Sequence, residues 1–211
     1  MKVSSSKENI LKKIRQALAN PVPVPFPHSE GNTSVYQPLE KELEIEFAEN
    51  FTGLLGKFAF CMDESELAQQ LQHLTISKQL KAIFCNDKPI KEKLTVFGYT
   101  NFASNNIASC DASITACELL IARTGSIVMS AAQPGGRTTS VYAPIHICIA
   151  YTSQLVYDIK EGLQALKEKY AHKMPSLITL ATGPSRTADI EKTLVVGVHG
   201  PKEVYLFLVE G

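Results

Sequence analysis

The chain has 211 residues, 45% of them hydrophobic and 20% charged, which is enough to bury the core of one domain with an appendage. Its 21 basic residues balance 21 acidic ones, which argues against a nucleic-acid binder or a polybasic membrane anchor. No apolar run approaches the roughly 20 residues of a membrane-spanning helix, and the charged N-terminal stretch lacks the apolar core of a signal peptide. We therefore expect a cytoplasmic protein that binds small molecules or protein partners.

Residues 1–20 are predicted to form an N-terminal helical arm. Ser5 and Glu8 have the spacing of a capping box, and apolar residues follow at helical intervals. Residues 21–38 form a proline-rich connector, because its prolines allow neither a helix nor a sheet. The arm either packs on its own domain or grips a second chain.

Residues 39–211 alternate helical patterns with short apolar runs, which predicts one α/β domain. Helices are expected at 39–56, from Asp63 through Leu71, at Pro89, as one turn at Cys117–Ala122, and, longest of all, from Ser153 or Gln154. Strands are expected at 57–62, 81–85, 94–97, 113–115, 126–130, 145–151, 177–180, 193–198 and 204–209. The alternation favours a largely parallel sheet covered by helices on both faces, with the final strand antiparallel to its predecessor.

The polar insert from Thr182 to Glu191 lies between two strand-like runs and is the first candidate site. Gly183 belongs to the turn signal that opens it, and Thr182, Ser185 and Thr187 are candidate helix caps. Asp189 and Glu191 are expected in the first helical turn. The pattern predicts a strand, a tight loop and a helix start, whose unpaired N–H groups would bind a carboxylate or phosphate beside Arg186. The alternative for Arg186 is an internal salt bridge.

A second candidate loop contains Gly135 and Gly136, which permit close approach of a ligand, followed by Arg137, which can pair with an anion. Its alternative is a plain Gly-Gly turn. Both loops, and His199 with its neighbour Gly200, follow strand-like runs. Because ligands gather at the carboxyl ends of strands in such sheets, we expect these loops to form a single pocket.

The five cysteines are widely spaced and include no CxxC pair, so we expect no metal site and no disulfide in this chain. His146, inside the strand-like run PIHICIA, is expected to be a satisfied core residue.

The stretch TGPSRTADIEKTLVVGVHGP closely resembles the closing signature of the LUD-domain family, and ITACELLIARTGSIVMS, GGR and PIHICIA resemble its central block. The resemblance extends from Asp111 to the C-terminus and implies a fold similar to the NagB/RpiA/CoA-transferase-like group. One departure is Arg123, where similar proteins often place an acid. Glu118 would then be the retained carboxylate.

The resemblance also implies a role in lactate utilization. Members of the family act with an iron–sulfur subunit and a cysteine-rich subunit in oxidising L-lactate to pyruvate. Ferredoxin-type cysteine clusters are absent from this sequence, so we expect a non-redox accessory subunit with an anion-binding pocket and no cofactor of its own. The iron–sulfur clusters would belong to partner subunits.

The alternative is a freestanding isomerase, ligase or transferase acting on a phosphorylated or CoA-linked metabolite, by analogy of fold. Glu118 would then be the nucleophile or base and His199 the acid, with the Ser185–Thr187 amides holding the anion. The competing interpretation of His199 is a turn histidine bonded to backbone.

Overall fold

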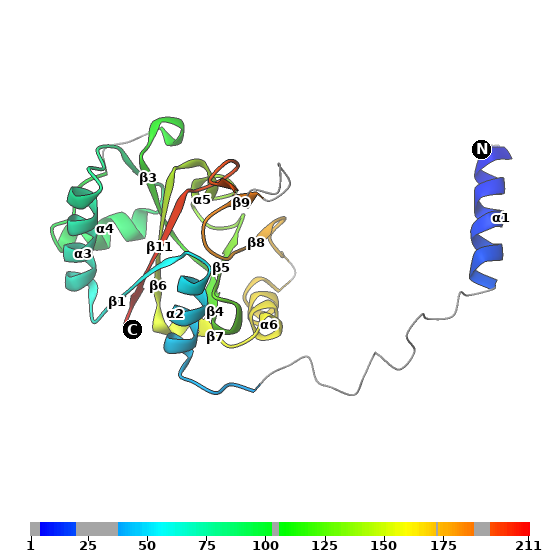
Figure 1. Ribbon diagram of the computed structural model, residues 1–211, viewed down its shortest axis with the longest axis horizontal. Coiled ribbons are helices and arrows are strands. Elements are labelled where there is room, and N and C mark those ends of the chain that lie inside the picture. The colour runs from blue at the N-terminus through cyan, green and yellow to red at the C-terminus, as the bar shows by residue number, and fades with distance from the viewer. Residues whose placement is uncertain (1–4, 20–37, 103–105, 172, 188–194) are drawn as a thin grey trace. The chain divides into compact units, whose positions relative to one another are not determined.

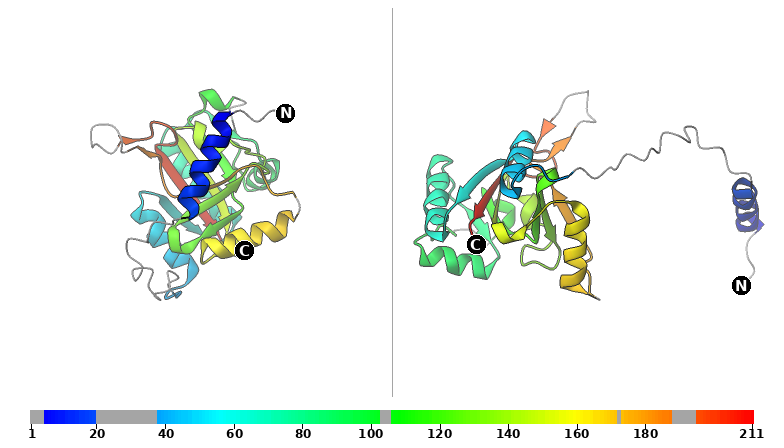
Figure 2. Two further views of the ribbon diagram at one scale, coloured as in Figure 1. Left: turned by 90° about the vertical axis from the view of Figure 1, so that its right-hand side faces the viewer. Right: turned by 90° about the horizontal axis from the view of Figure 1, so that it is seen from below.

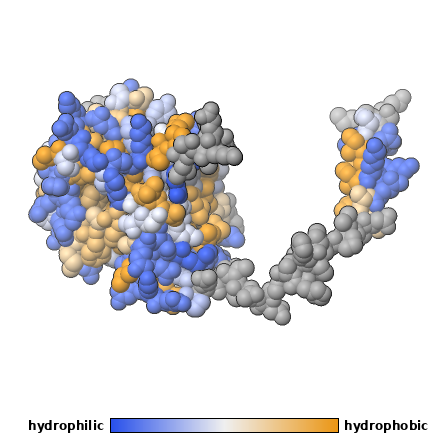
Figure 3. Space-filling view, in the orientation of Figure 1, coloured by the Kyte–Doolittle hydropathy of each residue, from blue (hydrophilic) through white to orange (hydrophobic). Residues whose placement is uncertain are grey.

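The computed structural model describes residues 5–19, 38–102, 106–171, 173–187 and 195–211. The chain divides into two compact units, residues 1–38 and 39–211. In the first, helix α1 (Ser5–Ala19) confirms the predicted helix. Figure 3 shows its apolar side chains along one side and its polar side chains along the other. The exposed apolar residues are Ile10, Leu11, Ile14 and Leu18.

The second unit is built on a five-stranded sheet whose order is β1-β11-β6-β3-β2. Every neighbouring pair in it is parallel, which confirms the predicted α/β class with its mostly parallel sheet. The strands are β1 (Lys57–Cys61), β2 (Ile83–Cys85), β3 (Ala112–Ala116), β6 (Ile145–Tyr151) and β11 (Glu203–Val209).

Helices α3 (Glu64–Ser77) and α4 (Lys88–Val96) cover one face of this sheet (Figure 1). Asp63 caps α3 and Asp87 caps α4, each by accepting a hydrogen bond from a backbone N–H of the first turn. The apolar side of α3 packs on the sheet because its leucines recur at helical spacing. This core includes Leu67, Leu71, Ile114, Ile147 and Phe207.

The other face is covered by α2 (Leu43–Gly53) and by a second sheet, which the sequence did not predict as a separate layer. Its order is β7-β4-β5-β8, from β4 (Leu119–Ile121), β5 (Ser126–Ser130), β7 (Leu155–Val156) and β8 (Ile178–Ala181). Helix α6 (Ile159–Tyr170) packs on its outer face through Leu166. Figure 2 shows these layers from below, from α3 at one side to α6 at the other.

The remaining elements are short. Strands β9 (Arg186–Thr187) and β10 (Val195–Val196) form an antiparallel ribbon, and α5 (Thr139–Tyr142) is one helical turn. In the described ranges, 3-10 turns lie at Ile107–Ser109, Ala122–Thr124 and Thr152–Gln154. Among the described residues, no helix is both long and apolar enough to span a bilayer.

Three predicted elements near the middle of the chain were wrong. Residues 94–97 end α4 instead of forming a strand, because Leu94 continues the buried side of that helix. Cys117–Ala122 is not a helical turn, since β4 occupies its middle, from Leu119 to Ile121. The helix expected from Ser153 begins at Ile159, where Asp158 supplies the cap, and it is shorter than α1 or α3.

Two predictions near the C-terminus were also wrong. Strand β11 is parallel to both its neighbours, and its run of buried residues fits a strand that is covered on both faces. Arg186 and Thr187 pair with β10 as a ribbon, so no helix starts at Ser185. A helix capped by Thr187 would lie outside the described residues. Asp189 and Glu191, expected in the first helical turn, lie outside the described residues.

Candidate functional site

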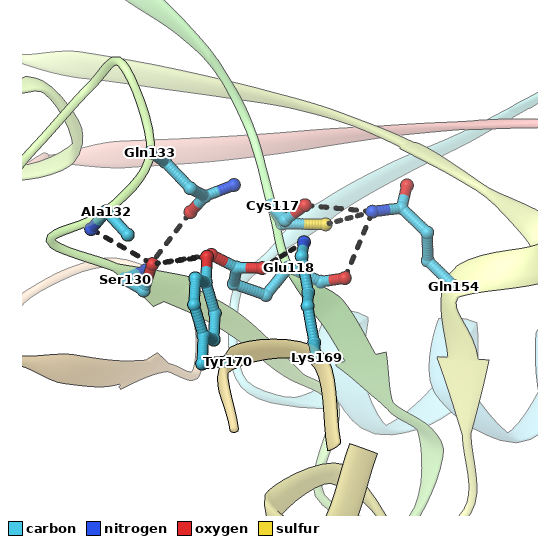
Figure 4. A network of polar contacts seen from close by, with 8 residues as sticks. All are labelled: Cys117, Glu118, Ser130, Ala132, Gln133, Gln154, Lys169 and Tyr170. Atoms are coloured by element: carbon cyan, nitrogen blue, oxygen red, sulfur yellow. Dashed lines mark hydrogen bonds and ion pairs between the residues drawn. The ribbon is translucent and has the colours of Figure 1, made fainter. Parts of the chain in front are cut away.

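Glu118 lies in the connection between β3 and β4, and its side chain is fully buried. Its Oε1 accepts hydrogen bonds from Ser130 Oγ at 2.5 Å and from Tyr170 Oη at 2.6 Å. Its Oε2 accepts a hydrogen bond from Lys169 Nζ at 2.7 Å. Figure 4 shows that three elements meet at this carboxylate, because Ser130 ends β5 and the other two donors end α6.

The carboxylate of Glu118 stays ionised in this setting. Burial by itself raises the pKa of Glu118, but the hydrogen bonds from Lys169, Ser130 and Tyr170 outweigh it, and the pKa is lowered. The pKa of Lys169 is raised, first by its hydrogen bond to Glu118. A carboxylate held by three donors, one of them a lysine, is a weak base and a poor nucleophile, so this arrangement fits an anchor better than a catalyst.

Hydrogen bonds to the backbone around Glu118 fix the position from which its side chain extends. Gln154 Nε2 donates to Cys117 O at 2.8 Å and to Glu118 O at 3.2 Å, and Glu118 N donates to Val128 O at 2.7 Å. On the other side, Gln133 Oε1 accepts a hydrogen bond from Ser130 N at 3.0 Å. The side chain of Glu118 therefore has little freedom to move.

A row of buried polar side chains lies beneath the loop that carries Gly135 and Gly136. His146 Nε2 and Thr115 Oγ1 are 2.8 Å apart, and Ser113 Oγ donates to a backbone carbonyl of α5 at 2.6 Å. Burial lowers the pKa of His146 to about 4, so it is neutral. This agrees with the expectation of a satisfied core histidine.

The two glycines themselves line a cavity of about 10 Å³ with Thr115 and Gln133. That volume holds no more than about one water molecule. Gly136 has a φ of 56°, which explains a glycine there by the turn alone. In this conformation the loop offers no room for a metabolite.

The two arginines that were expected to share a pocket lie near opposite ends of β8. Arg137 Nη2 donates to Ser176 Oγ at 2.6 Å, just before that strand. Arg186 Nη2 reaches Thr182 O at 3.4 Å, just after it. Both guanidinium groups are exposed, and neither forms an ion pair with a described residue.

The loop after β8 and the loop before β11 do come together. Ser185 N donates to Pro201 O at 3.0 Å, and Gly197 N donates to Ser185 O at 2.9 Å. A Cβ on Gly200 would lie 3.0 Å from Ser185 Cβ. Gly183 has a φ of 80° and lies against the Leu54 backbone, so packing explains that glycine without a ligand.

The loop before β11 borders an open groove of about 420 Å³. Exposed apolar side chains from α5 and the segment after β10 form its walls, and His199 and Lys202 add polar and cationic groups. The apolar side chains are Val141, Tyr142 and Val198, with exposed fractions of 42%, 59% and 47%. We call this groove, with Arg186 on the neighbouring strand β9, the His199 groove.

The structure thus joins only part of the predicted site. Ser185 meets the His199–Gly200 loop, whereas the Gly135–Gly136 loop opens into a different cavity. Glu118 has Ser130, Lys169 and Tyr170 as partners, and His199 is not among them. Sequence reasoning missed all three partners, because no local pattern links residues so far apart in the chain.

Arg123 has a structural partner that the sequence did not reveal. Its Nε lies 2.6 Å from Asp158 Oδ2, and Asp158 also caps α6. The pKa of Asp158 is lowered, mainly by the backbone hydrogen bond from Lys160. Burial raises this pKa, and the contact with Arg123 lowers it further. The arginine therefore acts here as part of a helix start.

Within the described part of the chain, no three His, Cys, Asp or Glu side chains are grouped to hold a metal ion. All five cysteines are free and buried. Burial raises the pKa of Cys61 and of Cys85 to about 11, so these thiols stay protonated.

Comparison with known families confirms the resemblance seen in the sequence. The LUD domain matches residues 45–209. Lactate utilization protein C of Deinococcus radiodurans is 35% identical over 100 residues, which are 47% of this chain and 46% of that protein. The protein of the same name in Bacillus subtilis is 36% identical over 98 residues, 46% of this chain and 41% of the relative.

The matched segment thus spans less than half the length of these relatives. An uncharacterized protein of Neisseria meningitidis is 32% identical over 99 residues, 47% of this chain and 42% of its own. Among solved structures, a DUF162 family protein from Deinococcus radiodurans aligns with a TM-score of 0.62 at 19% identity. That alignment covers 82% of this chain and 99% of the other, and it supports the fold alone.

Proposed function

Because the chain belongs to the LUD-domain family, we propose that it acts in lactate utilization as an accessory subunit that binds a partner and carries no electrons. Relatives named lactate utilization protein C support the lactate role. Partners with iron–sulfur clusters and a cysteine-rich subunit would carry out the oxidation of L-lactate to pyruvate.

The observation that carries a binding role is the His199 groove. Exposed apolar side chains that gather around a groove with a polar rim are typical of interaction surfaces, and Val141, Tyr142 and Val198 gather in this way. Lys202 gives the rim a positive charge, and Arg186 lies on the neighbouring strand that pairs with Val196. The groove therefore suits an acidic segment with apolar side chains, supplied by a partner subunit.

The state of Glu118 supports binding over catalysis. An enzyme that used this carboxylate as base or nucleophile would need it free to reach a substrate. Its three hydrogen bonds instead tie it to Ser130, Lys169 and Tyr170. We therefore assign Glu118 to the framework of the domain.

The test is growth of the source organism on L-lactate after deletion of the gene. We expect growth on L-lactate to be lost and growth on pyruvate to be kept, with the wild-type chain restoring the first. A chain with Arg186→Glu and Lys202→Glu should fold normally but fail to restore growth, since like charges would repel an acidic partner. The control Lys167→Glu changes an exposed lysine on α6, away from the groove, and should restore growth.

The same variants can be tested in binding. The tagged wild-type chain and Lys167→Glu should each recover an iron-containing partner from lactate-grown cells, and the charge-reversed chain should not. Normal lactate growth without the gene would disprove the lactate role. Full activity of the charge-reversed chain would disprove the role of the groove. Turnover of a phosphorylated or CoA-linked metabolite by the purified chain would favour the freestanding enzyme instead.

A further inference from the structure

Strand β1 lies at one edge of the five-stranded sheet. It pairs with β11 on one side, and within the described ranges no strand pairs with its other side. Phe60 on this strand is 39% exposed and Met62 just after it is 63% exposed. An unpaired edge of this kind is a template for pairing with another strand, because its N–H and C=O groups have no ladder partner.

A groove of about 550 Å³ lies beside this edge, between β1 and α3. Lys57 and Ala59 of β1 form its floor with Tyr205 and Phe207 of β11. Its wall is a single face of α3, since the residues recur at intervals of three and four: Glu66, Gln69, Gln70 and His73.

Glu66 and His73 lie at the two ends of this wall, and neither forms an ion pair with a described residue. Glu66 accepts hydrogen bonds from Met62 N and Gln70 Nε2, but it forms no ion pair with a described residue. His73 is exposed and has no hydrogen-bond partner within the described residues. An acidic and a basic group therefore stand one at each end of the same face, both open to the groove.

This face is complementary to itself. A two-fold axis passing between Gln69 and Gln70 would place Glu66 against the partner subunit's His73, and His73 against the partner subunit's Glu66. The two amide side chains would meet at the centre. In such an isologous interface every contact occurs twice, so a weak pair contributes double.

The edge strand allows the same symmetry. Antiparallel pairing of β1 with its own copy about Ala59 would set Phe58 opposite the partner subunit's Phe60, an aromatic cross-strand pair on one face. Gln70 Nε2 donates to Phe60 O at 3.3 Å, so the middle of the α3 face lies beside the middle of β1. In the paired strands a hydrogen bond from the partner subunit's Phe58 replaces this one at Phe60 O. One axis perpendicular to the sheet can therefore relate both the strands and the helices.

We propose that the chain forms a homodimer through antiparallel pairing of β1 with β1, with α3 packed against the α3 of the second copy. The two five-stranded sheets then join into one continuous sheet, and the groove between β1 and α3 is filled by the second copy. This interface lies on different elements from the His199 groove and does not depend on the proposed function.

Sedimentation equilibrium of the full chain tests the dimer. We expect a species of twice the mass of one chain at high concentration. His73→Glu should weaken association at least tenfold, because it faces the partner subunit's Glu66 with a like charge. The double variant Glu66→Lys with His73→Glu should restore it. The matched control Gln72→Glu adds the same charge next along the helix, outside the groove, and should leave association unchanged.

Cross-linking tests the position of the interface. Under mild oxidation Gln69→Cys should give a disulfide-linked dimer and Gln72→Cys should not, with little background because all native cysteines are buried. Circular dichroism checks that each variant is folded. A chain that stays monomeric at all concentrations would overturn the proposal. So would a dimer that is insensitive to His73→Glu and is not cross-linked through residue 69.

Discussion

His146 illustrates how a single side chain is fixed by the sheet around it. It is 1% exposed, and its Nε2 lies 2.8 Å from Thr115 Oγ1 across neighbouring strands. Burial penalises the imidazolium ion, which lowers the pKa of His146 from 6.5 to about 4. The residue belongs to the framework beneath the Gly135–Gly136 loop.

This lowered pKa predicts how stability depends on pH. Between pH 6.5 and 4 the unfolded chain binds a proton at His146 that the folded chain does not, so stability rises with pH in that window. The contribution is fully present above pH 6.5 and is lost as the pH falls toward 4. Its size is on the order of 3 kcal/mol, from about 1.4 kcal/mol per pKa unit.

Urea denaturation at a series of pH values checks this prediction. The loss of stability over that window should be smaller in His146→Gln than in the wild-type chain. If His146→Gln does not fold, NMR titration of the wild-type ring gives the same information. An imidazole of residue 146 that titrates near its ordinary pKa in the folded protein would refute the prediction.

At the scale of elements, α6 is attached to the second sheet at both ends. Asp158 caps its first turn and pairs with Arg123, while Lys169 and Tyr170 in its last turn hold Glu118. Leu166 packs between these two points. The carboxylate of Glu118 therefore connects β4, β5 and α6.

Removing that charge should loosen the helix. We expect Glu118→Gln to lower the free energy of unfolding by about 1–3 kcal/mol, because hydrogen bonds to a charged group are lost in a buried place. Glu168→Gln is the control on the same helix, exposed and hydrogen-bonded only to Gln164 among the described residues, and should change stability by less than about 0.5 kcal/mol. Urea denaturation measures both.

The alternative outcome would be informative about function. If Glu118→Gln were as stable as the wild-type chain but failed to support growth on L-lactate, the carboxylate would have a functional role that our proposal denies.

At the scale of the whole molecule, residues 39–211 form a compact unit by themselves. The core of that unit includes residues from both the start and the end of its sequence, such as Phe47 and Leu208. The parallel strands β1, β6 and β11 tie these distant segments together.

We therefore predict that residues 39–211 fold without the N-terminal arm. The urea midpoint of this fragment should match that of the full chain, since its core is complete. A clear loss of stability on removal of residues 1–38 would show instead that the arm packs on the domain. Circular dichroism and urea denaturation distinguish these results.

Local patterns in the sequence predicted many of the elements correctly. Periodicity and capping residues such as Asp63 gave α3, and apolar runs gave β6 and β11, because these signals act within a few residues of the chain. Where the local signal was ambiguous, the tertiary structure decided. Leu94 fits either a strand or a helix, and the core against α3 and the sheet selects the helix.

The candidate site shows the same limit more strongly. The predicted loops pointed to Arg137, Arg186 and His199, and the family resemblance pointed to Glu118. Only the folded chain decided that Arg137 and Arg186 lie near opposite ends of β8, and that Glu118 is paired with Lys169. Residue types and local periodicity are written in the sequence, whereas contacts between distant segments depend on how the sheets pair and pack.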